Sequence, residues 1–138
     1  MNLSLLSKFF LISLFSFQTI FSQNQVQWSA QARQTDDSTY DVVINASIID
    51  NWKLYSTDLP EGGPLPTVLK WRNSTQIEKL QTSLPKSGYD PIFLMELSYY
   101  EKEATFIQKV KNNSKHIYLI IEYQACDDKL CIFREEVI

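Results

Sequence analysis

Short runs of strand-forming residues, separated by turn signals, set the strongest limit on what this chain can fold into. The runs are rich in valine, isoleucine, tyrosine and tryptophan, which favour β-strands. They span residues 26–34, 40–49, 52–56, 68–73, 96–110 and 115–126. Residues 96–110 are long enough for two strands, and no competing helical period is present among these runs. The pattern predicts an all-β fold, a single domain built as a β-sandwich.

Two segments between these runs are expected to be irregular. The sequence DLPEGGPLPT at 58–67 holds three of the five prolines and two of the three glycines. Proline cannot donate to a strand ladder and glycine favours turns, so this segment should be a loop. The sequence SLPKSGYDPIFLM at 83–95 is expected to be a second irregular segment.

The N-terminus has the pattern of a secretory signal peptide. Lys8 precedes an apolar run at 9–21, and the small residue Ser22 follows it. The run is too short, and too often interrupted by polar residues, for a transmembrane helix. We therefore expect residues 1–22 to be a cleaved signal peptide and 23–138 to be the single domain, outside the cytoplasm. Cleavage would remove Lys8 alone among the charged residues and leave a formal charge of −4 instead of −3 on 116 residues. This mildly acidic domain gives no support for nucleic-acid binding.

The stretch YQACDDKLC at 123–131 holds both cysteines of the chain. If Asp128 and Lys129 form a two-residue turn, Cys126 and Cys131 face each other across a hairpin. Opposed residues of an antiparallel pair have Cα atoms about 4.5–5.5 Å apart, and disulfides need about 4.4–6.8 Å. The two cysteines can therefore form a disulfide without backbone movement, in a compartment where disulfides persist.

Three chemistries could use such a pair: a structural staple, a metal site or a reversible redox disulfide. With one histidine and two cysteines in the chain, a tetrahedral zinc site would also need two carboxylates, so we expect no metal. A staple gains little here, because the stabilisation by a disulfide grows with the length of the loop that it closes. The sequence therefore favours redox chemistry over a passive brace.

The neighbouring charges refine this hypothesis. Asp127 and Asp128 lie next to the cysteines, and Lys129 is the only cation close in sequence. Negative neighbours disfavour a thiolate, whereas reactive cysteines usually have positive charge nearby. We therefore expect a relay whose cysteines react once a partner has docked. We also expect Cys126 to be the sulfur that partners reach and Cys131 to be the buried one.

The run IIEYQACDDKLC resembles the cysteine signature of the N-terminal periplasmic domain of DsbD-type thiol:disulfide interchange proteins. The stretches NWKLYS, LPEGGPLPT and SGYDPIF occur in the same order in such domains, and the resemblance covers about 26–133. It implies an immunoglobulin-like sandwich with the cysteine hairpin at one edge. Three features depart from the family pattern: the short loop between the cysteines, Lys53 where some members have an aromatic residue, and Ile132 with Phe133 after the second cysteine.

The resemblance also implies a function, that of a protein-disulfide reductase without a cofactor. Such a domain receives electrons from a membrane-embedded thiol reductase and passes them to periplasmic acceptors, which are disulfide isomerases and thioredoxin-like proteins of cytochrome c maturation. No counterpart of the family's membrane and C-terminal domains precedes Ile138, so separately encoded partners are expected. The alternative is a non-catalytic immunoglobulin-like binding module with a bracing disulfide.

The resemblance assigns roles to further residues around the cysteines. Phe93 would be the aromatic cap over the disulfide, with Asp90 in the same loop, and Tyr55 would lie near the sulfurs. The alternative for both aromatic residues is ordinary packing in the sandwich core. Asp127 and Asp128 complete the expected surroundings of Cys126 and Cys131.

Overall fold

The computed structural model describes residues 24–138, so the expected signal peptide at 1–22 lies outside the described residues. Every strand pairing within this part of the chain is antiparallel. The strands are β1 (Val26–Asp36), β2 (Thr39–Ile48), β3 (Lys53–Tyr55), β4 (Val68–Trp71), β5 (Thr75–Gln76), β6 (Gln81–Thr82), β7 (Lys86–Asp90), β8 (Met95–Tyr100), β9 (Glu103–Lys111), β10 (Leu119–Cys126) and β11 (Cys131–Val137). No helix long and apolar enough to cross a membrane occurs in 24–138.

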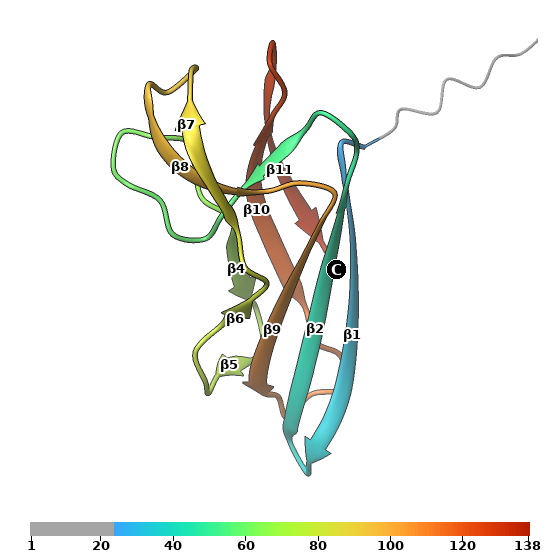
Figure 1. Ribbon diagram of the computed structural model, residues 1–138. Helices are drawn as coiled ribbons and strands as arrows, with labels where there is room; N and C mark the ends of the chain where they lie inside the picture. The colour runs from blue at the N-terminus through green and yellow to red at the C-terminus, as the bar shows by residue number, and fades with distance from the viewer. Residues whose placement is uncertain (1–23) are drawn as a thin grey trace, which may run out of the picture.

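The strands form two sheets that pack face to face (Figure 1). A five-stranded sheet has the order β1-β2-β9-β5, and β6 also pairs with β9. A six-stranded sheet has the order β11-β10-β3-β8-β7, and β4 also pairs with β10. The turn between β10 and β11 and the turn between β7 and β8 lie at the same end of the molecule, at the top of Figure 1. The expected all-β, immunoglobulin-like sandwich is confirmed.

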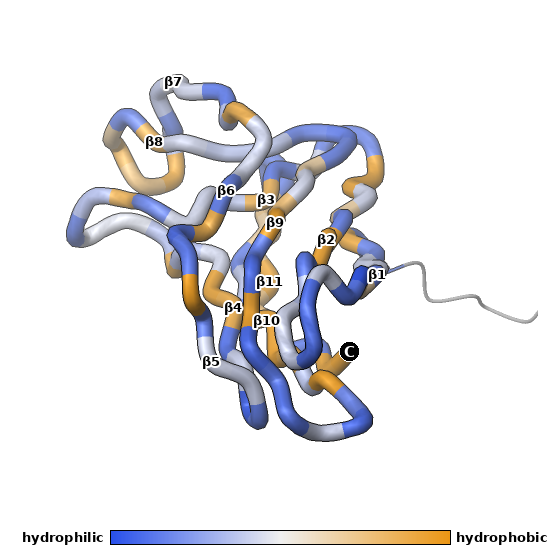
Figure 2. Tube along the Cα trace, turned by 90° about the horizontal axis from the view of Figure 1, so that it is seen from below, coloured by the Kyte–Doolittle hydropathy of each residue, from blue (hydrophilic) through white to orange (hydrophobic). Residues whose placement is uncertain are grey.

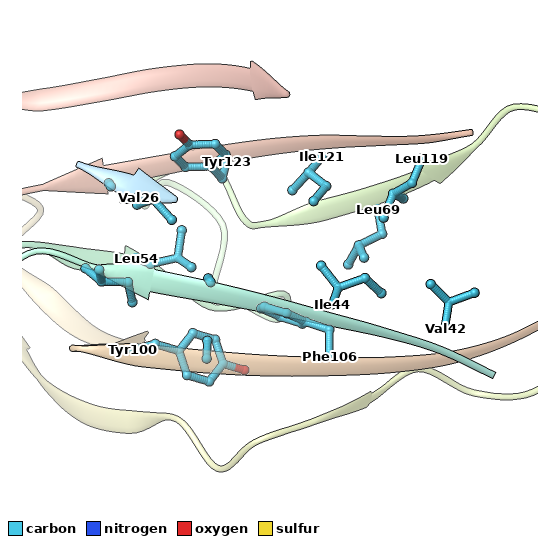
Figure 3. Packing of buried hydrophobic residues seen from close by; sticks show 14 of the residues in the cluster. Val26, Val42, Ile44, Leu54, Leu69, Tyr100, Phe106, Leu119, Ile121 and Tyr123 are labelled. Carbon is cyan, nitrogen blue, oxygen red and sulfur yellow. The ribbon is translucent and has the colours of Figure 1, made fainter. Parts of the chain in front are cut away.

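The main core lies between the two sheets. Side chains of β9, and those of β10 as far as Ala125, alternate between buried and less buried positions, because successive residues of a strand point to opposite faces. Figure 3 shows Ile44 and Phe106 of the five-stranded sheet facing Ile121 and Tyr123 of the six-stranded sheet. All four side chains are almost completely buried. Burial of this apolar surface is the main force that holds the two sheets together.

The expected strands and the loop at 58–67 are confirmed, but the expectation of an irregular segment at 83–95 is wrong. Lys86–Asp90 forms β7, which pairs with β8 from Lys86 opposite Tyr99 to Asp90 opposite Met95. Local patterns do not reveal this strand, because β7 is an edge strand whose side chains are mostly exposed and lack hydrophobic alternation. The last expected strand begins at Leu119, four residues after position 115.

Candidate functional site

A disulfide joins Cys126, the last residue of β10, to Cys131, the first residue of β11. The two residues are direct partners in the ladder, and their Cα atoms are 4.1 Å apart. The backbone N–H of Asp127 donates a 2.9 Å hydrogen bond to the carbonyl oxygen of Leu130, which closes the expected two-residue turn. Because β11 ends the order of the six-stranded sheet, the cysteine hairpin lies at a sheet edge, as expected.

Asp127 holds this turn in shape. Its Oδ1 accepts hydrogen bonds from the backbone N–H groups of Lys129 at 2.8 Å and Leu130 at 2.7 Å. These bonds favour the charged carboxylate and hold the pKa of Asp127 below its usual value. The charge of Asp127 is therefore directed at the turn backbone, while its neighbour Asp128 is exposed to solvent.

The disulfide lies on the outer face of the six-stranded sheet and not in the main core. In the ladder, Leu54 faces Ala125, and the next pair along is Lys53 and Cys126. Leu54 and Ala125 belong to the main core. Since neighbouring residues of a strand point to opposite faces, Cys126, Lys53 and Tyr55 point away from that core.

A second apolar cluster surrounds the disulfide on this outer face. Tyr55, Leu97 and Cys126 are its buried members, and partly buried side chains of Leu59, Phe93, Met95, Tyr99 and Cys131 pack against it. Leu59 comes from the proline-rich loop, and Phe93 comes from the hydrophobic turn between β7 and β8 that Figure 2 shows. Two chain segments far apart in sequence therefore cover the disulfide.

The close fit of the proline-rich loop depends on Gly63. A Cβ atom at this position would lie 3.1 Å from Sδ of Met95 and 3.2 Å from Cδ2 of Leu97, closer than ordinary side-chain contacts. The base of the loop is closed by the buried Thr67, whose hydroxyl donates a 2.6 Å hydrogen bond to the carbonyl oxygen of Tyr55. The loop is thus fixed against the outer cluster at its middle and at its end.

Asp90 organises the turn that carries Phe93. It is the last residue of β7 rather than a loop residue, and its carboxylate is buried. One oxygen accepts a 2.7 Å hydrogen bond from the hydroxyl of Tyr55, and the other accepts hydrogen bonds from the N–H groups of Ile92 at 2.9 Å and Phe93 at 3.3 Å. The ring of Phe93 stands edge-on to the ring of Tyr55, with 5.8 Å between centroids. Burial first, then the hydrogen bond to Asp90 and its negative charge, raise the pKa of the Tyr55 phenol.

The structure places most of the residues that the sequence singled out around one hollow of about 150 Å³, while Cys131 and Phe93 pack against the neighbouring outer cluster. Cys126, Asp127, Asp128, Asp90 and Tyr55 line this hollow. Phe93 is not part of the lining: it packs over Tyr55, and Ile92 reaches the hollow instead.

Two residues of this site were missed by the sequence reasoning. Lys53 is the ladder partner of Cys126 and lines the same hollow, so Lys129 is not the only cation near the sulfurs. Gln124 lies two residues before Cys126 on the same face, and its side-chain Nε2 donates a weak hydrogen bond to Sγ of Cys126, with an N···S distance of 3.8 Å. No local signal could place Lys53 there, because the pairing of β3 with β10 is a tertiary contact.

The burial of the two sulfur-bearing residues is the reverse of what we expected. Cys126 is only 2% exposed, whereas Cys131 is partly exposed. The reason is position: β10 is flanked by β11 and β3, whereas Cys131 begins the edge strand. Cys131 is thus the more accessible end of the disulfide.

Comparison with known proteins gives a family match and a fold match. The family model described as "Thiol:disulfide interchange protein DsbD, N-terminal" matches residues 18–138. The N-terminal periplasmic domain of ScsB from Proteus mirabilis superposes with a TM-score of 0.68 at 17% identity, over 86% of this chain and 47% of that one. The reduced form of the DsbD N-terminal domain from Neisseria meningitidis gives a TM-score of 0.52 at 17% identity, over 80% of this chain and 83% of that one.

At this level of identity the two structures establish a shared fold. The chain spans about half the length of the ScsB structure. No curated protein matches the sequence.

Proposed function

Because this chain belongs to the family of N-terminal domains of the thiol:disulfide interchange protein DsbD, we propose that it relays electron pairs through a reversible Cys126–Cys131 disulfide. The observation that carries the proposal is the place of this bond. It lies on the outer face of a sheet, joins a buried cysteine to a partly exposed one, and closes a hairpin that backbone hydrogen bonds already hold. Opening such a bond leaves the sandwich core untouched.

The geometry supports one order of steps. A partner thiolate attacks Sγ of Cys131, the accessible sulfur, and a mixed disulfide forms as the Cys126–Cys131 bond breaks. The electron pair of the broken bond goes to the sulfur of Cys126. A second thiolate of the partner then attacks the mixed disulfide and releases Cys131, so the partner is oxidised and this domain gains two electrons and two protons. Transfer to an acceptor disulfide is the same sequence in reverse, with Cys131 as the attacking thiolate.

The surroundings of the bond support control by a docked partner. Phe93 and Ile92 lie on a turn that is fastened by hydrogen bonds to one buried carboxylate, that of Asp90. Displacement of this turn would open the outer cluster without disturbing the main core. We assign Phe93 the role of cap and assign Tyr55 and Asp90 the role of holding the cap closed.

The family membership supports a proposal for the partners and the compartment. The donor is a membrane-embedded thiol reductase, and the acceptors are periplasmic thioredoxin-like or disulfide isomerase proteins. The periplasm fits both the signal-like N-terminus of the sequence and the related ScsB domain, which is a periplasmic domain.

The reduction potential tests this function against the alternative of a bracing disulfide in a binding module. A relay should equilibrate with glutathione-range buffers, at about −180 to −270 mV, as known oxidoreductases do. A potential below about −300 mV would place the bond among resistant structural disulfides and overturn the proposal.

Single-cysteine variants test the order of attack. Cys126→Ser leaves Cys131 free and should form a mixed disulfide rapidly with a small disulfide such as oxidised glutathione. Cys131→Ser leaves only the buried sulfur and should react much more slowly. Equal rates for the two variants would contradict Cys131 as the entry point.

A further inference from the structure

We propose that Gln124 and Lys53 form a site that stabilises negative charge on the sulfur of Cys126 when the disulfide opens. This inference rests on the proposed function and names two residues that act on its departing sulfur. In the order of steps given above, the electron pair of the broken bond goes to Cys126. The sulfur that must carry the negative charge is therefore that of Cys126, the more buried of the two cysteines.

A thiolate in such a position needs compensation. Cys126 is 2% exposed and belongs to an apolar cluster. Burial in apolar surroundings disfavours the charged form of a thiol and raises its pKa. A sulfur with a higher pKa is also a slower leaving group in disulfide exchange. Without nearby donors or positive charge, opening of this bond would be slow.

Gln124 supplies a hydrogen-bond donor aimed at this sulfur. Its Nε2 lies 3.8 Å from Sγ of Cys126, which is a weak contact to a disulfide sulfur. The other end of the amide is fixed, since its Oε1 accepts a 2.7 Å hydrogen bond from the backbone N–H of Leu65. This bond from the proline-rich loop turns the N–H₂ group toward the sulfur. When charge develops there, the contact becomes a charge-assisted hydrogen bond, which is shorter and stronger than a neutral one.

Lys53 supplies a positive charge on the same face. It is the direct ladder partner of Cys126, and both residues line the 150 Å³ hollow. Its Nζ lies over the ring of Tyr99, 4.8 Å from the centroid. None of the ion pairs found in residues 24–138 includes Lys53, although carboxylates line the same hollow. The ammonium is thus on the face that carries the disulfide, with no carboxylate of the described residues close enough to pair with it.

The other charged groups around the hollow make this cation necessary. Asp90 is engaged by Tyr55 and by the cap turn, and Asp127 is engaged by its own turn, yet both carry negative charge beside the sulfur. Asp128 adds a third carboxylate at the rim. These carboxylates oppose a thiolate at Cys126, and Lys53 is the cation that lines the hollow with them.

The step is a simple transfer of charge. A partner thiolate forms a bond to the sulfur of Cys131, the bond from Cys131 to Cys126 breaks, and its electron pair stays on Cys126 as a thiolate. Lys53 remains protonated throughout, and Gln124 donates its N–H without losing it. Both residues act by electrostatics, with no proton moved in the step.

The test measures the titration of the Cys126 thiol in the full chain. In a Cys131→Ser background Cys126 is the only thiol, and its thiolate can be followed by absorbance near 240 nm as pH is raised. Loss of a nearby cation raises a thiol pKa by about 1–3, and partial exposure of Lys53 favours the lower end. We therefore expect Lys53→Met to raise the pKa of Cys126 by about 1, and Lys53→Arg to leave it close to wild type.

A second readout is the rate of disulfide reduction by dithiothreitol as a function of pH. Lys53→Met and Gln124→Leu should each slow the reduction severalfold in the protein with both cysteines. Lys129→Gln is the matched control, because it removes a cation near the same cysteines in sequence that lies outside the hollow, and it should change neither readout.

The outcomes separate this inference from the proposed function. If wild type resists reduction altogether, the relay itself is wrong. If wild type is reduced readily but Lys53→Met matches it in both thiol pKa and rate while remaining folded, the charge-stabilising role of Lys53 is overturned. An equal effect of Lys129→Gln would also overturn it, since the effect would then come from net charge. For Gln124→Leu, a lower melting temperature with an unchanged rate would show that Gln124 serves only to hold Leu65.

Discussion

Replacement of Phe93 by alanine should make the Cys126–Cys131 disulfide easier to reduce while the sandwich stays folded. Truncation of a fully buried phenylalanine costs about 3–5 kcal/mol. Phe93 is only partly buried and packs on the small outer cluster, edge-on to Tyr55. We therefore expect Phe93→Ala to lose about 1–2 kcal/mol of stability, and most of this loss should destabilise the closed position of the turn that carries residue 93. If a reductant reaches the sulfur only when this turn lifts, the reduction rate should rise about 5–30-fold.

Stopped-flow reduction by dithiothreitol, with denaturant melts of the same proteins, measures both quantities. Leu94→Ala is a matched control from the same turn, because Leu94 is 72% exposed and has little packing to lose. Ile92→Ala distinguishes the two candidates for the cap, since Ile92 lines the hollow beside Cys126. A loss of about 3–5 kcal/mol with an unchanged rate would make Phe93 an ordinary packing residue. Faster reduction in Ile92→Ala alone would move the cap to Ile92.

Three further predictions follow from the same site. The double variant in which Cys126 and Cys131 are both serine should lose at most about 2 kcal/mol in denaturant melts and keep its fold, because the disulfide closes only a short loop. Unfolding of this variant near room temperature would instead show that the disulfide is a structural staple. Asp127→Ala should be less stable than wild type above about pH 4, and the difference in stability should vanish as pH falls. The reason is that a carboxyl group whose pKa is lowered in the folded state stabilises that state only while it is ionised. A difference in stability that persists at about pH 2 would contradict the turn-capping role. Tyr55→Phe should cost about 1–3 kcal/mol, because it takes a donor from the buried Asp90. Wild type should also lose stability above about pH 10, where unfolded tyrosine ionises but Tyr55 with its raised pKa does not, and Tyr55→Phe should lack that part of the loss.

Local patterns were sufficient for most of the fold and for the disulfide. The alternation in β9 and β10 places one face of each strand in the core, so the strands could be recognised without their partners. The hairpin from Cys126 to Cys131 could be derived because its geometry depends on only six consecutive residues. The edge strand β7 could not, since its stability comes from pairing with β8 and not from its own pattern.

The positions of Tyr55, Asp90 and Phe93 near the cysteines were predictable only through the family resemblance. Tyr55 and Asp90 are 35 residues apart, and no local rule joins them. The position of Lys53 also could not be predicted from local sequence. Its charge was visible in the sequence, but its place beside Cys126 required the pairing of β3 with β10.

The sequence by itself determined the elements whose energetics are local: the alternating strands, the proline-rich loop, and a cysteine pair spaced to close across one turn. The tertiary structure decided which face of the sheet carries the disulfide, which sulfur is exposed, and which charges surround it. The physical reason is that accessibility and electrostatic environment depend on what packs against a residue. Cys131 is accessible because β11 is an edge, and Cys126 is buried because β3 and the segments that cover the outer cluster pack around it. The sequence could therefore establish that the bond forms, and only the packing of distant segments shows from which side a partner can open it.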